Sequence, residues 1–172
     1  MVRKIKKFIN VLVVLIPIVV LIVDQLTKQL ITRTMEIGQS SRVIRNFLYI
    51  TYHRNSGAAF GILQGQMLFF YVITAIAVIA IILWMIKLDF KKEPILAISL
   101  ALILGGALGN LIDRVMYQAV IDFIHTIWWG NSFPIFNVAD IALVCGAFLM
   151  AIDVLILDPR RKKELYFSPD HN

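Results

Sequence analysis

Long apolar runs separated by shorter polar stretches dominate the sequence. Four runs, at about 8–31, 67–86, 95–112 and 138–157, are each long enough for a helix that crosses a bilayer. The run at 67–86 contains no charged or amide side chain, so we expect it to act as a scaffold. The pattern therefore predicts a membrane protein built from four transmembrane helices.

Two longer polar stretches, at about 32–66 and 113–137, separate the first helix from the second and the third from the fourth. Residues 43–52 are rich in β-branched and aromatic side chains, which favours a strand and hence a small sheet at the membrane surface. The second stretch contains adjacent tryptophans, Trp128 and Trp129, which are typical of the membrane interface. We expect this second stretch to be a loop or an interfacial segment.

The basic residues predict the orientation of the helices. Eleven of the 17 lysines and arginines lie in the N-terminal segment, the loop between the second and third helices, and the C-terminal segment. The other six are spread over the two longer stretches, so the positive-inside rule places both termini in the cytoplasm. The predicted fold class is therefore an all-α membrane protein with four transmembrane helices, a small extracytoplasmic β-sheet and an outer loop or interfacial segment.

The N-terminal segment has an alternative interpretation. Its basic start and apolar run are also typical of a secretory signal peptide. No small-residue cleavage site follows, however, and the helical pattern continues to Ile31. We therefore predict a first helix that is retained in the mature protein.

The composition agrees with a membrane protein. The chain has 172 residues, of which 59% are hydrophobic and 16% charged, and its mean hydropathy is +0.80. Soluble domains are closer to half apolar and a quarter charged. The length suits one membrane-embedded domain spanning 1–172. The net charge of +6 could indicate nucleic acid, but the basic residues lie near helix ends as topology signals do, so we predict no nucleic-acid partner.

Two acidic residues stand in apolar surroundings at the predicted membrane edge. Asp122 lies between Ile121 and Phe123 in a predicted loop, and Asp140 opens the fourth helix. Carboxylates are costly in such settings, which indicates a function. Two of them brought together can share a proton and act as acid and base, although the spacing alone does not require that they meet. The single cysteine and three scattered histidines show no metal-ligand spacing, so we predict no metal and no cofactor.

Other polar residues cluster near the same level of the membrane. Asp24 and Lys28 are four residues apart on the first helix, where they either form a simple ion pair or support a site. Asn110 and Arg114 have the same spacing at the end of the third helix, and the simpler interpretation of Arg114 is interfacial snorkelling. Asn137 lies one turn before Asp140. A site at this level would account for all of these residues together.

Five sequence blocks resemble, in the same order, those of the bacterial lipoprotein signal peptidases (signal peptidase II). They are DQLTK at 24–28, NSGAAFGIL at 55–63, ILGGALGNLIDR at 103–114, VIDFI at 120–124 and FNVAD at 136–140. The resemblance extends from about residue 24 to residue 146 and shows no departure at a key position.

This resemblance implies a membrane-embedded aspartic endopeptidase that cleaves prolipoproteins before a diacylglyceryl-modified cysteine. It implies that Asp122 and Asp140 are the catalytic pair and that Asp24 and Lys28 support them. The residues expected to bind substrate or hold the site are Asn55, Gly57, Asn110, Arg114, Asn137 and Ala139. The expected partners are the lipid-modified prolipoprotein and membrane lipid. We expect a monomer in the bacterial cytoplasmic (inner) membrane, with its active site at the extracytoplasmic face.

A small transporter or proton-relay protein is the alternative function. Such a protein would use its membrane-edge carboxylates, Asp24, Asp113, Asp122 and Asp140, along a path. Transporters usually place charge near the middle of the bilayer, at broken helices of an internal repeat. The middle parts of the second and third helices carry no charge and no repeat is visible, so the sequence favours the peptidase.

Overall fold

The computed structural model describes residues 2–57 and 63–159, with side chains from residue 11 onward. Its helices are α1 (Val2–Thr34), α2 (Met67–Lys87), α3 (Pro94–Tyr117) and α4 (Val138–Ile152), and α4 continues into a π-helical turn, η2 (Asp153–Leu157). Four helices in the described part of the chain are long and apolar enough to cross a membrane. The predicted fold class is therefore confirmed. The basic C-terminal segment used for the orientation lies outside the described residues.

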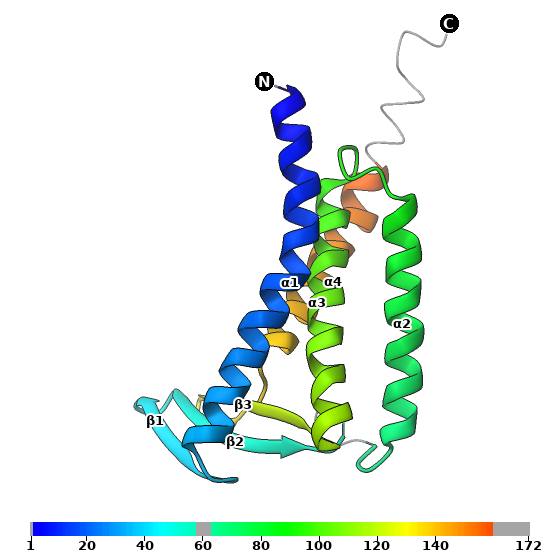
Figure 1. The fold of residues 1–172 in the computed structure, drawn as a ribbon. Helices are drawn as coiled ribbons and strands as arrows, with labels where there is room; N and C mark the ends of the chain where they lie inside the picture. Colours follow the sequence, from blue (N-terminus) through cyan, green and yellow to red (C-terminus); the bar gives the residue numbers. More distant parts are fainter. Residues whose placement is uncertain (1, 58–62, 160–172) are drawn as a thin grey trace, which may run out of the picture.

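Helix α3 lies at the centre of the bundle and contacts α1, α2 and α4 (Figure 1). Glycines allow two of these neighbours to approach closely. A Cβ atom added to Gly105 would lie 2.9 Å from the Cβ atom of Val20 in α1, and one added to Gly106 would lie 2.5 Å from the carbonyl oxygen of Ala139 in α4. Only a residue without a side chain fits at such distances, so these glycines fix how closely α1 and α4 pack on α3.

A four-stranded antiparallel sheet crosses one end of the bundle, which we call the sheet end (Figure 1). Its strands are β1 (Ser40–Ile44), β2 (Leu48–Asn55), β3 (Val120–Trp128) and β4 (Asn131–Ser132), in that spatial order. Buried Ile31 of α1 packs with Tyr52 of β2 and with Ile121 and Phe123 of β3. This apolar cluster attaches the sheet to the helices and fixes the position of β3 beneath them.

Three local predictions need correction. The strand predicted at 43–52 is a hairpin, in which β1 and β2 are joined by a turn with Asn46 at φ 59°. Asp122 is in strand β3 and not in a loop, because β3 pairs with β2 along most of its length. The third helix was predicted to end at 112 but continues to Tyr117 and stops where Gln118 adopts a left-handed conformation. Asp113 and Arg114 therefore belong to α3.

Candidate active site

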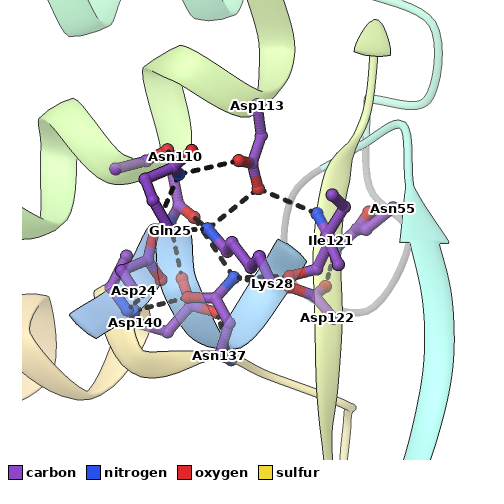
Figure 2. Close-up of polar contacts among 12 residues, drawn as sticks. Asp24, Gln25, Lys28, Asn55, Asn110, Asp113, Ile121, Asp122, Asn137 and Asp140 are labelled. Carbon is purple, nitrogen blue, oxygen red and sulfur yellow. Dashed lines mark hydrogen bonds and ion pairs between the residues drawn. The ribbon is translucent and has the colours of Figure 1, made fainter. Parts of the chain in front are cut away.

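Asp122 and Asp140 both line a cavity of about 850 Å³ at the sheet end of the bundle. Asp122 projects from β3 and is 2% exposed, whereas Asp140 projects from the first turn of α4. Asn137 connects them. Its side-chain amide donates to Asp122 Oδ1 over 2.7 Å, and its backbone N–H donates to Asp140 Oδ2 over 3.1 Å. One residue therefore sets the position of both carboxylates (Figure 2).

Asn137 can do this because it is the N-cap of α4. Its backbone is extended and its side-chain oxygen accepts the N–H of Asp140 over 2.9 Å. Together with the bond from the Asn137 N–H to the Asp140 carboxylate, this makes a reciprocal capping box. The helix start thus holds the Asp140 carboxylate while the side-chain nitrogen of Asn137 donates to Asp122.

The Asp122 carboxylate is buried but has two amide donors. Asn55 Nδ2 donates to Oδ2 over 3.0 Å, and the Asn137 amide occupies Oδ1. The N–H of Gly57 donates to Asn55 Oδ1 over 3.0 Å and so orients the Asn55 amide. Burial, and next the negative charge of Asp140, raise the pKa of Asp122 to about 7, although the two amides and Lys28 act in the opposite direction. Near neutral pH this carboxyl group therefore binds a proton part of the time.

Asn110 of α3 holds Asp140 from the other side. Its amide nitrogen donates to Asp140 Oδ1 over 2.8 Å. Its oxygen accepts from Lys28 Nζ over 3.1 Å and from Asn137 Nδ2 over 3.2 Å. Asn110 therefore joins the carboxylate pair to a second, deeper polar group.

This deeper group is a buried ionic cluster formed by Lys28, Asp24 and Asp113. Lys28 Nζ lies 2.8 Å from Asp24 Oδ2 and 2.8 Å from Asp113 Oδ2, and none of these three residues is more than 1% exposed. The remaining Asp24 oxygen accepts the N–H of Ala139 over 2.9 Å, and Asp113 Oδ2 also accepts the N–H of Ile121 over 3.0 Å. The cluster therefore holds the backbone immediately before each carboxylate of the pair.

Two further residues complete the surroundings of the pair. A Cβ atom added to Gly109 would lie 2.6 Å from Asp24 Oδ2, so the cluster requires a glycine at this point of α3. The Arg114 guanidinium lines the cavity and lies 4.6 Å from the centre of the Phe70 ring. Its Nε is buried and has no hydrogen-bond partner among the described residues. Arg114 therefore has a donor available for a bound molecule.

All ten site residues predicted from the sequence lie in this region of the structure. The predicted pair lines the cavity, and Asp24, Lys28 and Ala139 lie behind it. Asp113 and Gln25 also belong to the network, although the sequence assigned neither to the peptidase site and placed Asp113 only in the transporter alternative. Gln25 Nε2 donates to Asp113 Oδ1 over 3.0 Å. The signal for Asp113 was its place directly before Arg114 in the ILGGALGNLIDR block, but its carboxylate was assigned to the end of a helix.

The cavity has two chemically different walls. Polar groups of β2, β3 and α3 form one wall, whereas Ile141, Val144 and Cys145 of α4 contribute an apolar one. Ile141 and Val144 are 44% and 69% exposed, so this wall continues onto the outer surface of the bundle. In the described part of the chain, no three His, Cys, Asp or Glu side chains are grouped as a metal ion would require. The site can therefore place two carboxylates beside a ligand that is partly apolar.

Comparisons with known proteins agree on one family. The sequence profile of a family described as signal peptidase (SPase) II matches residues 16–156. A lipoprotein signal peptidase of Listeria monocytogenes serotype 4a is 51% identical over 148 residues, which cover 86% of this chain and 96% of that protein. The lipoprotein signal peptidase of Bacillus pumilus is 51% identical over 150 residues, or 87% of this chain and 96% of the relative.

Two solved structures are also similar to this chain, in fold and in sequence. A bacterial membrane enzyme determined by the in meso method at 2.3 Å resolution superposes with a TM-score of 0.79 at 44% identity, over 93% of each chain. A second bacterial membrane enzyme, at 1.9 Å resolution, gives a TM-score of 0.76 at 48% identity, over 84% of this chain and 92% of the other.

Proposed function

Because the chain belongs to the signal peptidase II family, whose members remove signal peptides from prolipoproteins, we propose that Asp122 and Asp140 are its catalytic pair. The chain is thus a peptidase of the bacterial inner membrane that removes signal peptides from prolipoproteins. The observation that carries the proposal of an aspartic mechanism is the Asn137 bridge between two carboxylates in one cavity. Such a pair suits peptide hydrolysis by general acid–base catalysis.

In the proposed reaction the pair shares one proton. Asp122 carries this proton at rest, because it is the more buried carboxyl group and its pKa is raised to about 7. Ionised Asp140 accepts a proton from a water molecule, which attacks the scissile carbonyl carbon. Asp122 donates a hydrogen bond to the developing oxyanion and then gives its proton to the leaving amine. The side-chain amide of Asn110 and the backbone N–H of Asn137 keep Asp140 in place throughout.

The two walls of the cavity support a diacylglyceryl-modified substrate. The scissile peptide would lie against the polar wall, where Arg114 and Asn55 have N–H groups suited to peptide carbonyls. The signal helix and the acyl chains would lie along the exposed apolar wall of α4, where Ile141 and Val144 face outward. This arrangement leaves the apolar parts of the substrate in lipid while the reacting bond enters the cavity.

We propose further that the whole chain, 1–172, acts as one membrane-embedded unit and as a monomer. Its orientation follows from the positive-inside rule, with both termini cytoplasmic and the sheet end extracytoplasmic. The alternative of a transporter or proton relay is less well supported. Asp24, Asp113, Asp122 and Asp140 gather at one end of the bundle in a single network, whereas a path across the membrane needs groups along its length.

A cleavage assay with the purified protein in liposomes tests this proposal. The substrate is a prolipoprotein with or without diacylglyceryl on its cysteine, and a chelator control is included. We expect cleavage of the lipidated substrate alone, unchanged by chelator and abolished by Asp122→Asn and by Asp140→Asn. The matched control is Asp89→Asn in the exposed loop between α2 and α3, which should cleave normally. Full activity of either site variant, with all proteins shown to be folded, would refute the catalytic pair.

A further inference from the structure

The free end of the sheet carries several exposed apolar side chains. This end, which we call the sheet tip, comprises residues 42–47 and 128–131, that is, the β1–β2 turn and the β3–β4 turn. The two turns are adjacent, since the N–H of Ile127 donates to the carbonyl oxygen of Phe47 over 2.8 Å. The large apolar residues of the sheet tip are exposed, with exposed fractions of 58% for Val43, 49% for Ile44, 36% for Phe47, 48% for Trp128 and 93% for Trp129.

Three aromatic rings form a continuous patch on the tip. The Phe47 and Trp128 rings meet edge to face with centroids 5.1 Å apart, and the Trp128 and Trp129 centroids are 6.0 Å apart. Trp129 adopts φ 48°, a left-handed conformation that is uncommon for a residue other than Gly or Asn. The β3–β4 turn thus presents the Trp129 indole to the surroundings of the protein. A contiguous apolar patch of this kind usually marks an interaction surface.

The position of the tip identifies the surface that it faces. Figure 1 shows that β1 and the adjoining ends of β2 and β3 project sideways past α1, beyond the helices of the bundle. Because the helices cross the bilayer, a sheet that extends past the outermost helix at the end of the bundle lies over lipid and not over protein. Tryptophan is the residue most suited to this headgroup region, since its ring is apolar and its N–H is polar.

The positive charge of the sheet tip favours anionic lipids over neutral ones. Arg42 and Arg45 are exposed on the hairpin, and residues 40–55 contain three arginines and no acidic residue. Arginine near a membrane is attracted to anionic phospholipid, and its long stem allows the charge to stay at the phosphates while apolar neighbours go deeper. A second copy of the chain would bring the same positive charges together, so self-association is disfavoured by the same residues.

We propose that the sheet tip docks onto the anionic phospholipid headgroups of the leaflet at the sheet end. Phe47, Trp128 and Trp129 enter the boundary between headgroups and acyl chains, and Arg42 and Arg45 bind phosphate oxygens. Strand β2 has the tip at one end and Asn55 at the other, so docking sets the height of the cavity wall above the bilayer. This surface is distinct from the cavity and does not depend on the proposed peptidase mechanism.

Tryptophan fluorescence of the full chain in nanodiscs tests the apolar part of the proposal. The variant Trp84→Phe leaves Trp128 and Trp129 as its only tryptophans. We expect their emission to be shielded from acrylamide in water and quenched by phospholipids that carry bromine near the top of the acyl chains. Emission that acrylamide quenches freely and brominated lipid leaves unchanged would overturn the proposal. Shielding from acrylamide without quenching by lipid would also overturn it, because the tip would then be covered by protein.

The electrostatic part is tested by varying the phosphatidylglycerol content of phosphatidylcholine nanodiscs at low and high salt. In the Trp84→Phe background, shielding of the tip tryptophans from acrylamide should increase with phosphatidylglycerol content and decrease with salt concentration. Adding Arg42→Gln and Arg45→Gln should lower the ratio of docked to free tip about 30-fold, since each arginine near an anionic surface contributes about fivefold. Lys91→Gln with Lys92→Gln, in the exposed loop at the opposite end, is the matched control and should change nothing. Equal responses in the two double variants would refute a role for the arginines.

Discussion

Replacing Lys28 by methionine should show how strongly the buried ionic cluster stabilises the protein. The Lys28 ammonium lies 2.8 Å from both Asp24 and Asp113, and its side chain is 2% exposed while theirs are fully buried. Methionine keeps the length of the side chain but leaves two buried carboxylates without a cation. Removing one partner of a buried ion pair costs about 3–5 kcal/mol, because the remaining charge keeps its desolvation cost. We expect the free energy of unfolding to fall by an amount in this range.

A double-mutant cycle makes this expectation specific to charge. Adding Asp113→Asn to Lys28→Met removes one of the two uncompensated carboxylates, so the double variant should be more stable than Lys28→Met alone. The measurement is unfolding by SDS titration in mixed micelles, followed by far-ultraviolet circular dichroism. Lys91→Met, at an exposed loop position, is the control and should change stability by no more than about 0.5 kcal/mol. Additive losses in the double variant, or a Lys28→Met protein as stable as wild type, would refute the reasoning.

Four further predictions test other parts of the site. Gly109→Ala should lower the free energy of unfolding by about 1–3 kcal/mol and reduce cleavage, because the added Cβ would lie 2.6 Å from Asp24 Oδ2. A variant that is as stable as wild type would contradict this. Cleavage should fall as pH rises through about 7, where Asp122 loses its proton, and a rate that stays flat across that range would count against Asp122 as the acid. Folding raises the pKa of Asp122, so its contribution to the free energy of unfolding is fully present below about pH 4 and is lost as pH rises to about 7. Asp122→Asn should remove this pH dependence from the free energy of unfolding. Asn137→Ala should cost about 1–2 kcal/mol through loss of the helix cap and should also reduce kcat, whereas a change in melting alone would exclude its role in the pair.

The helices could be predicted from the sequence because lipid leaves few alternatives. Backbone polar groups inside a bilayer must be satisfied within the segment, so a long apolar run specifies a helix. The end of α3 could not be located in this way. Asp113 and Arg114 look like residues at a membrane boundary, but Asp113 is neutralised by Lys28 of α1, which is distant in sequence. A local pattern cannot reveal a partner on another helix.

The strands show a similar limit. Residues 120–128 are rich in β-branched and aromatic side chains, as 43–52 are, yet this stretch was predicted to be a loop or an interfacial segment. The strand exists because β2 supplies its hydrogen bonds, and Asn55 of β2 also supplies a donor to Asp122. Asp122 is thus accommodated within β3 by the strand that pairs with it. Spacing along the chain carried no information about this contact.

The positions of the two carboxylates are coupled through a single cation. Lys28 binds Asp24 and Asp113; Asp24 accepts the N–H of the residue before Asp140, and Asp113 accepts the N–H of the residue before Asp122. These hydrogen bonds to backbone N–H groups fix the main chain, and the carboxylates of the pair accept their own hydrogen bonds from Asn55, Asn110 and Asn137. A carboxylate pair that shares a proton needs fixed separation, since its titration depends on the distance between the charges. Placing the positive charge one layer behind the pair provides this separation without neutralising either carboxylate directly.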